Sequence, residues 1–244
     1  MKNHTAMPDP PRSPGGDAER LRDLVVACGD RWEGEPADAV LRWAGRTFGD
    51  RLCATSSMSD AVIVHMLARH VPGTDVLFLD TGEHFAETLE FRHELAGRYQ
   101  VNVIDLRWDA QMSGAISPEL RDEFTRDPHS CCWRRKVAPL SRALESYDAW
   151  ITGIRRVEAA SRDATPVISW DERNQVVKIA PIAAWTDEQV AEYSRAHRLP
   201  ANPLTSRGYT SIGCAPCTAP PTSDDPRSGR WPGWAKTECG LHTP

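Results

Sequence analysis

The 244-residue chain lacks any apolar run long enough to cross a membrane, and no signal peptide opens it. We therefore expect a cytoplasmic protein with no membrane partner. The formal net charge of −5 gives the whole molecule no attraction for nucleic acid or for an anionic membrane surface. In the reducing cytoplasm the seven cysteines do not predict a disulfide framework, and metal or redox chemistry explains them better.

The two common phosphate-binding fingerprints are also missing. The chain has no GxxxxGK[ST] sequence, and no two glycines have the spacing of a dinucleotide-binding loop. Basic residues nevertheless gather in three islands: "WRRK" at 133–136, "IRR" at 154–156 and "DPRSGRWPGWAK" at 225–236. Basic islands on an acidic protein indicate either a small anionic ligand or ordinary solvated faces.

The order of the predicted elements indicates an α/β fold without internal repeats. Residues 1–20 are rich in proline, glycine and charge and predict a disordered leader, and residues 21–48 have a helical pattern. Predicted strands at 51–56, 75–80, 101–107 and 148–154 then alternate with predicted helices at 59–70, 84–99 and 131–146. This alternation predicts an open, mostly parallel sheet with helices on both faces.

The last third of the chain carries a hairpin, a helix and an irregular arm. Residues 166–182 predict two edge strands that turn at "DERN", and residues 186–197 predict a helix with Thr186 and Gln189 as a capping box. Beyond Pro203 the chain is rich in Gly, Pro and Ser. We expect a nucleotide-binding domain over 21–220 and a mobile C-terminal tail over 221–244.

A serine-rich segment follows the first predicted strand. Open parallel sheets bind ligands beyond the carboxyl ends of their strands, and "ATSSMSD" places Ser56, Ser57 and Ser59 at such an end. Hydroxyl and backbone N–H groups at the start of a helix can hold phosphate or sulfate oxygens. Serines also serve there as ordinary helix caps, so the segment alone leaves both roles open.

Four cysteines form two sequence pairs. Cys131 and Cys132 are adjacent, whereas Cys214 and Cys217 have CxxC spacing. Four thiolates from two loops predict a site for zinc or for an iron–sulfur cluster, with reactive disulfides as a third alternative. Structural zinc sites draw on two spaced pairs. Adjacent side chains diverge, so the spacing favours a wider cluster that offers each thiolate its own iron.

The other three cysteines differ in setting. Cys28 and Cys53 lie on apolar elements and are expected to be inert core residues. Cys239 lies in the polar sequence "WAKTECGLHTP", with Lys236 and His242 three residues away on either side. Nearby positive charge favours the thiolate form of a cysteine. The sequence therefore indicates that Cys239 is reactive.

Several ordered blocks carry a family resemblance. They are "LDTGEHFAET", "CCWRRKVAPL", "ITGIRR", "AAWTDEQV", "NPLTSRGYTSIGCAPCT" and "DPRSGRWPGWAKTECGLH", and they cover nearly the whole chain after the leader. In these blocks the chain resembles the bacterial assimilatory adenylyl-sulfate reductases, members of the phosphoadenylyl-sulfate reductase family. The resemblance implies an adenine nucleotide α-hydrolase-like fold, and it implies a [4Fe–4S] cluster on Cys131, Cys132, Cys214 and Cys217.

The resemblance also implies a reaction at the tail. The substrate would be adenosine 5′-phosphosulfate, and the Cys239 thiolate would attack its sulfur, releasing AMP and leaving an S-sulfocysteine. A thiol of thioredoxin would then attack Cys239 and release sulfite. Plant members carry a fused thioredoxin-like domain, but this chain ends at Pro244, so we expect thioredoxin as a separate protein. A homo-oligomer stays open.

Substrate-binding residues are implied in the same way. Ser56, Ser57 and Asp60 match the nucleotide loop of the family. The phosphosulfate is assigned to Lys136, Arg155, Arg156, Arg227 and Arg230. His242 is expected either to keep Cys239 ionised or to close the tail over the site. Glu83 departs from relatives that often have an aromatic or basic residue there, which leaves the nucleotide contacts near it open.

Three other functions compete. Reductases of the 3′-phosphorylated nucleotide share "KTECGLH" but generally lack the two cysteine pairs. A zinc-stabilised nucleotide-binding module without redox turnover leaves Cys239 and "RSGRW" without a purpose. An ATP-cleaving adenylating enzyme of the same fold is opposed by the absence of a glycine-rich loop at 55–60.

Overall fold

The computed structural model describes residues 16–108 and 122–242, which contain a six-stranded sheet in the order β3-β2-β1-β4-β6-β5. The strands are Leu52–Thr55 (β1), Asp75–Asp80 (β2), Val103–Arg107 (β3), Ala149–Thr152 (β4), Ile168–Asp171 (β5) and Val176–Ile179 (β6). Neighbouring strands are parallel except β5 and β6, which form the antiparallel hairpin predicted at 166–182. The mostly parallel sheet is therefore confirmed.

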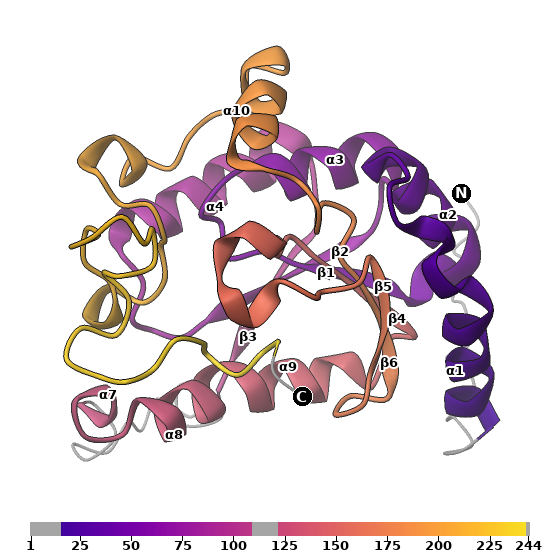
Figure 1. Ribbon diagram of the computed structural model, residues 1–244, viewed down its shortest axis with the longest axis horizontal. Coiled ribbons are helices and arrows are strands. Elements are labelled where there is room, and N and C mark those ends of the chain that lie inside the picture. The colour runs from indigo at the N-terminus through magenta and orange to yellow at the C-terminus, as the bar shows by residue number, and fades with distance from the viewer. Residues whose placement is uncertain (1–15, 109–121, 243–244) are drawn as a thin grey trace, which may run out of the picture.

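Helices cover both faces of the sheet, as Figure 1 shows, with α3 and α4 on one side and α8 and α9 on the other. The longer helices are Gly16–Cys28 (α1), Ala37–Phe48 (α2), Val62–His70 (α3), Ala86–Tyr99 (α4), Ala138–Leu144 (α9) and Asp187–Ala196 (α10). Shorter turns are Gly29–Trp32 (η1), Gly49–Arg51 (η2), Glu123–Arg126 (α7), Pro128–Cys132 (α8), Trp133–Val137 (η3), Arg156–Glu158 (η4), Ala160–Arg162 (η5), Thr205–Arg207 (η6) and Ala215–Cys217 (η7). Among the described residues, no helix combines the length and the apolar character that a membrane span requires.

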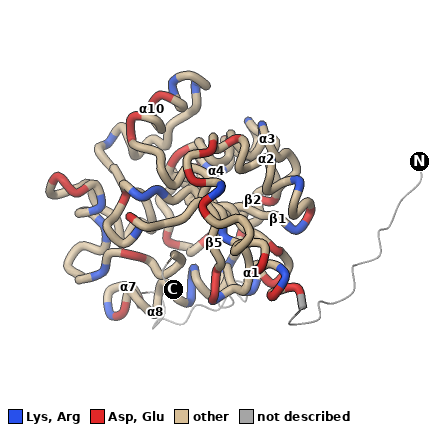
Figure 2. Tube along the Cα trace, turned by 45° about the vertical axis from the view of Figure 1, so that its right-hand side comes forward, with Lys and Arg blue, Asp and Glu red and all other residues tan. Residues whose placement is uncertain are grey.

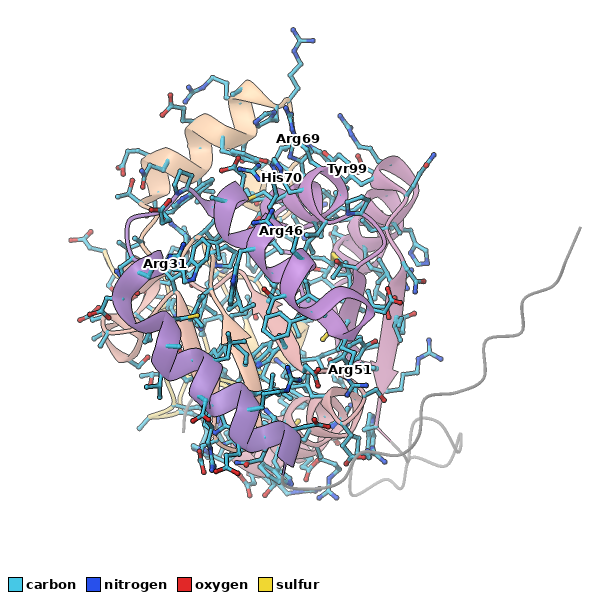
Figure 3. All side chains as sticks on the ribbon, turned by 90° about the vertical axis from the view of Figure 1, so that its right-hand side faces the viewer. Arg31, Arg46, Arg51, Arg69, His70 and Tyr99 are labelled. Carbon is cyan, nitrogen blue, oxygen red and sulfur yellow. The ribbon has the colours of Figure 1, made fainter. Side chains whose placement is uncertain are left out.

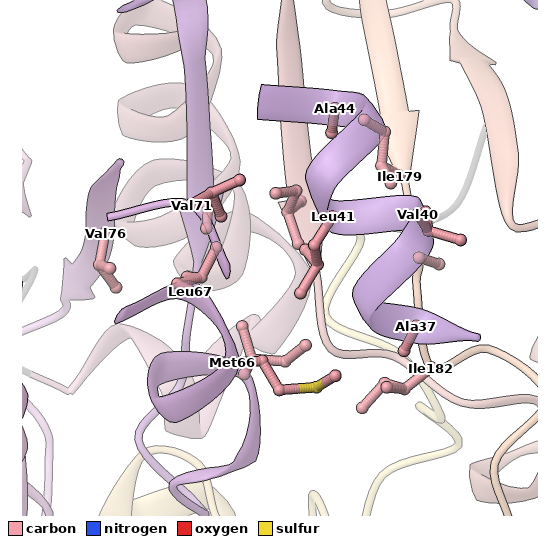
Figure 4. Close-up of a cluster of buried hydrophobic side chains, with 14 of the residues drawn as sticks. Ala37, Val40, Leu41, Ala44, Met66, Leu67, Val71, Val76, Ile179 and Ile182 are labelled. Atoms are coloured by element: carbon pink, nitrogen blue, oxygen red, sulfur yellow. The ribbon is translucent and has the colours of Figure 1, made fainter. Parts of the chain in front are cut away.

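The two faces follow from the alternation of side chains along each strand. Leu52 and Ala54 of β1 belong to the larger core under α2, α3 and α4, whereas Cys53 between them packs in a second core under α9. Figure 4 shows Leu41 of α2 and Met66 of α3 in the space between these two helices. Cys53 is fully buried, in agreement with the expected inert core residue.

Three sequence expectations about helices have informative outcomes. The predicted helix at 21–48 is two helices, because Gly29 and Gly34 have positive φ and Pro36 precedes α2. The first of them begins at Gly16, inside the expected leader, of which residues 1–15 lie outside the described part. The capping box is confirmed: Gln189 N donates to Thr186 Oγ1 at 3.3 Å, and Thr186 N donates to Gln189 Oε1 at 2.9 Å.

The predicted helix at 131–146 begins earlier, at Pro128, and contains a π-helical turn. Asp127 caps its first turn, since one carboxylate oxygen accepts hydrogen bonds from His129 N and Ser130 N. The turn at η3 widens the helix directly after the cysteine pair. Such π-helical insertions are common at functional sites.

The strand order places a topological switch point beside β1. From β1 the chain continues to β2 and β3 on one side and later returns through β4 to the other side, so a switch point lies between β1 and β4. Arg51, labelled in Figure 3, pairs with Asp148 at 3.0 Å and fixes the amino ends of these two strands. Charges of both signs are interspersed along the chain in Figure 2, in keeping with the modest net charge.

Candidate active site

The four cysteines of the two sequence pairs line one cavity, called here the cysteine cavity. Cys131 and Cys132 come from α8, while Cys214 and Cys217 lie at the ends of the turn that contains η7. The side chains around this cavity pack closely, leaving an open volume of about 10 Å³, and the atoms exposed inside it are apolar. Trp231 of the C-terminal arm covers it and is 2% exposed. The structure thus brings together two cysteine pairs that are separated by at least 82 residues in the sequence.

The four thiols face one apolar space and are donors that both zinc and an iron–sulfur cluster take. Within residues 16–108 and 122–242, no three His, Cys, Asp or Glu side chains surround one ion position. Burial raises the pKa of Cys131 to about 12 and that of Cys217 to about 11, as expected for thiols in an apolar cavity.

A loop after β2 supports the cavity from the sheet. Thr81 Oγ1 lies 3.3 Å from Cys214 Sγ, and Ala215 N donates to the carbonyl oxygen of Glu83 at 2.7 Å. Arg135 Nη1 donates to the carbonyl oxygen of Thr81 at 2.7 Å and to Glu83 Oε1 at 3.1 Å. Glu83 therefore neutralises a buried arginine beside the cysteines. Sequence reasoning missed Thr81 and Arg135.

The predicted nucleotide loop lies at the carboxyl end of β1. Its serines form local hydrogen bonds, because Ser56 Oγ accepts from Met58 N at 3.2 Å and Ser57 Oγ lies 3.1 Å from Ser59 Oγ. Asp60 Oδ1 accepts from Val62 N at 2.8 Å and so caps the start of α3. These bonds fix the shape of the loop beside the switch point, where open sheets bind ligands.

Arg155 and Arg156 follow β4 and are held by carboxylates. Arg155 Nη2 lies 2.8 Å from Asp187 Oδ1, and Arg156 Nη2 lies 2.6 Å from Glu33 Oε2. The charge of Arg155 still acts on Asp60 of the nucleotide loop. Both arginines thus lie at the predicted edge of the sheet, where each pairs with a carboxylate from another element.

Four other basic residues form a group called here the basic cluster: Lys136, Arg162, Arg227 and Arg230. Burial above all, with the charges of Arg162 and Arg230, lowers the pKa of Arg227. Arg230 donates through Nη1 to Ser211 Oγ at 3.1 Å and packs over the Trp231 ring at 4.5 Å. Several positive side chains gathered in one place favour the binding of an anion beside them.

The tail, residues 234–242, lies against the body of the protein. Both oxygens of Glu238 accept hydrogen bonds from Arg162, and Arg173 Nη1 donates to the carbonyl oxygen of Gly240 at 2.7 Å. Leu241 packs in the core under α9, and the His242 ring stacks on Trp150 with centroids 5.7 Å apart. The mobility expected of this segment stays a prediction, but the docked position is well defined by contacts.

Cys239 lies between the cysteine cavity and the basic cluster. It packs with Cys214, Cys217 and Trp231, and the positive charge of Lys136 faces it. Burial alone lowers the pKa of Lys136, but the sulfurs of Cys214, Cys239 and Cys132 outweigh this effect and raise it. Lys136 therefore stays positively charged beside the Cys239 thiol.

His242 has a different electrostatic setting. Burial above all, followed by the charges of Lys178, Arg162 and Arg227, lowers its pKa well below the ordinary value. The ring is consequently neutral at physiological pH and supplies no charge to Cys239. Its stacking on Trp150 agrees with the other expected role, which is to hold the tail over the site.

Arg162 is the main residue that sequence reasoning missed. Its side chain is buried and pairs with Glu158 and with Glu238, which is 76 residues further along the chain. In the sequence it stands alone in "AASRDA", away from the basic islands. No local pattern marks such a residue, because its role depends on a tertiary partner.

Comparisons with known proteins agree with this geometry. The phosphoadenosine phosphosulfate reductase domain family matches residues 52–220. A protein of Rhodococcus opacus called adenosine 5′-phosphosulfate reductase is 48% identical over 233 residues, covering 91% of this chain and 94% of the relative. A protein of the same name from Streptomyces coelicolor is 48% identical over 228 residues, covering 92% and 95%.

Solved structures show the same fold. A phosphoadenylyl-sulfate reductase of Candida auris, in a phosphate complex, superposes with a TM-score of 0.63 at 27% identity, covering 83% of this chain and 96% of that chain. FMN adenylyltransferase of Candida glabrata has a TM-score of 0.54 at 14% identity, covering 84% and 75%, and it shares the fold alone.

Proposed function

The chain belongs to the phosphoadenosine phosphosulfate reductase family, and from this premise we propose that it reduces adenosine 5′-phosphosulfate to sulfite and AMP. The observation that carries the proposal is the position of Cys239. This thiol is docked beside the charged Lys136, and the residue before it contacts Arg162 and Arg227 of the basic cluster. A nucleophile next to a group of cations suits an anionic electrophile.

The first step is a transfer of the sulfuryl group. The thiolate of Cys239 attacks the sulfur of the phosphosulfate, an S–Sγ bond forms, and the bond from sulfur to the phosphate oxygen breaks. AMP leaves with the electron pair, and Cys239 carries an S-sulfo group. Arg227 and Arg230 hold the phosphosulfate oxygens, because guanidinium forks suit them, while Lys136 acts as a point charge on the developing negative charge. Ser56, Ser57 and Asp60 contact the nucleoside, with Arg155 and Arg156 at the edge of that site.

The cysteine cavity would hold a [4Fe–4S] cluster through Cys131, Cys132, Cys214 and Cys217. Their four-thiol donor set and shared apolar space are compatible with this assignment, and the adjacent pair Cys131–Cys132 favours it over zinc. When bound, the cluster would join the two cysteine loops and place its charge near the substrate site. Lys136 lies between these cysteines and Cys239, so its position is sensitive to both.

The second step returns the enzyme to its starting state. A thiolate of thioredoxin, a separate electron donor in the cytoplasm, attacks Cys239 Sγ and sulfite leaves with the electron pair of the broken bond. The second thiol of thioredoxin then attacks the mixed disulfide, which regenerates the Cys239 thiolate and leaves oxidised thioredoxin. The unphosphorylated nucleotide is the proposed substrate because the two cysteine pairs accompany that preference, and the relatives at 48% identity bear its name.

The reaction is tested with enzyme and substrate in the absence of any reductant. We expect about one AMP per active site and a gain in mass of one SO₃ group on the peptide that contains Cys239. Cys239→Ser should lose both the AMP burst and the adduct but still bind AMP, and Cys28→Ser serves as the control. An adduct on another cysteine, or sulfite formation by Cys239→Ser at near wild-type rate, would contradict the mechanism. A higher kcat/KM for the 3′-phosphorylated substrate would contradict the substrate assignment.

A further inference from the structure

A groove on the outer side of the tail leads to Cys239. It holds about 400 Å³ of open space and is called here the tail groove. Its lining includes Cys239 and Gly240 of the tail and Arg173 from the turn between β5 and β6. Trp133 of η3 also lines it and is 55% exposed.

The helix from 128 to 137 separates the tail groove from the cysteine cavity, because its two sides face different spaces. The cavity side consists of Cys131, Cys132, Arg135 and Lys136. The groove side consists of His129, Ser130, Trp133, Arg134 and Val137. In the described part of the chain the two spaces share no lining residue, and no member of the basic cluster lines the groove. Cys239 therefore faces the basic cluster on one side and open solvent on the other.

This arrangement matters for the step that discharges the S-sulfo group, and the inference rests on the proposed function. When a thiolate attacks a divalent sulfur, it approaches opposite the bond that breaks, and the leaving group departs with the electron pair. After transfer, the SO₃ group on Cys239 faces the basic cluster from which it came. The line of attack on Cys239 Sγ then starts in the tail groove.

We propose that the tail groove is the docking site of a protein dithiol, whose first thiolate enters through it to form a disulfide with Cys239 and release sulfite. The second thiol of the same partner attacks that disulfide. The partner then dissociates with its two cysteines joined in a disulfide, and Cys239 is again a thiolate. The thiol is reached with the tail docked as in the structure. A route of this kind does not require the tail to withdraw.

The groove also indicates the surface of the partner. Among the residues that the structure describes, its charged lining side chains are Arg134, Arg173 and Lys236, and none of them is a carboxylate. The exposed Trp133 ring lies under the Arg173 guanidinium at 5.8 Å, and Arg173 in turn holds the tail at Gly240. Exposed tryptophan and arginine side chains are typical anchors of protein interfaces. The matching partner has a reactive cysteine in an apolar surface with acidic residues around it.

The test separates docking from chemistry. Full-length Trp133→Ala and Trp133→Phe enzymes are converted to the S-sulfo form with adenosine 5′-phosphosulfate, freed of nucleotide, and mixed with reduced thioredoxin or with dithiothreitol. Trp133→Ala should keep the AMP burst and lower the second-order rate of sulfite release by thioredoxin about tenfold or more. Its rate with dithiothreitol should not fall, and Trp133→Phe should retain most of the thioredoxin rate.

Trp234→Ala is the matched control, since Trp234 is also exposed, at 43%, but does not line the groove. It should discharge at the wild-type rate with both reductants. A wild-type thioredoxin rate in Trp133→Ala overturns the docking site, as does an equal fall with dithiothreitol, which would mean a general distortion around Cys239. If the wild-type enzyme gives no AMP burst at all, the proposed function is wrong. Failure of the docking site and failure of the proposed function are therefore distinguishable.

Discussion

Arg162 holds both carboxylate oxygens of Glu238, the residue directly before Cys239, with Nε–Oε1 and Nη2–Oε2 distances of 2.7 and 2.9 Å. Ser161 Oγ donates to the same carboxylate at 3.2 Å, and Arg227 Nη2 lies 3.3 Å from it. The Glu238 side chain is only 7% exposed. Bidentate, charge-assisted bonds of this kind are the strong class of hydrogen bond. The position of Cys239, the proposed nucleophile, is thus coupled to two arginines of the basic cluster.

Glu238→Gln should loosen the tail while preserving its shape. The amide keeps the size of the side chain but loses the charge that Arg162 and Arg227 neutralise, so docking should weaken by roughly 1–3 kcal/mol. We expect faster hydrogen exchange over residues 236–242 and a slower AMP burst, both measured on the full chain. The overall melting temperature should change little, because the hydrogen-bond partners of this carboxylate, Ser161, Arg162 and Arg227, lie outside the six strands.

The control for this substitution is Glu188→Gln, in the first turn of α10, where the carboxylate is exposed. It should leave both the exchange and the burst unchanged. Unaltered exchange over 236–242 in Glu238→Gln would show that the ion pair does not hold the tail.

The same ion pair predicts how docking depends on pH. Burial raises the pKa of Glu238, but the hydrogen bond and charge of Arg162, with the charge of Arg227, outweigh burial and hold the pKa below its ordinary value. A carboxyl with a lowered pKa contributes stability that is present above its ordinary pKa and is lost as the pH falls through the lowered one. Docking should therefore be constant between about pH 6 and 8 and be lost only in acid, below about pH 4.5.

Fluorescence anisotropy of a dye ligated to the C-terminus measures this transition. The wild-type signal should fall in acid before the far-ultraviolet circular dichroism changes, because the tail is released while the sheet persists. Glu238→Gln should show a smaller and flatter change. An equal acid transition in the two proteins would assign it to other carboxyls.

Local chemistry explains which features were predictable from the sequence. The alternation of Leu52, Cys53 and Ala54 between two cores follows from strand geometry alone, so the sheet and its two covered faces were predicted correctly. The capping box at Thr186 is likewise complete within four residues. The convergence of the cysteine pairs was expected from the donor chemistry, which needs four thiols in one place.

Features that depend on distant partners were not predictable. Arg156 pairs with Glu33 across 123 residues and Arg162 with Glu238 across 76, and no short pattern specifies either pair. The same holds for Glu83, whose partner Arg135 lies 52 residues away. Packing of the whole chain decides such pairs, because a charged side chain on a partly buried surface takes whichever opposite charge the fold brings near it.

The cysteine cavity leads to a prediction about metal content. Protein purified without air should be brown and contain about four irons with matching acid-labile sulfide. Cys132→Ser or Cys214→Ser should lose iron, colour and activity together, because each removes one thiolate from the shared cavity. Iron and sulfide analysis with the visible absorption spectrum measures all of this except the activity.

Cys28→Ser is the matched control for these substitutions, because Cys28 is half-buried at the end of α1 and does not line the cavity. It should keep the iron content and the spectrum of the wild type. Cys239→Ser should also keep them, since Cys239 packs beside the cavity without lining it. Colourless protein with stoichiometric zinc would refute the cluster. Iron loss in Cys239→Ser would instead show that the Cys239 thiol is itself needed to hold the metal, and so is not separate from the four proposed cluster ligands.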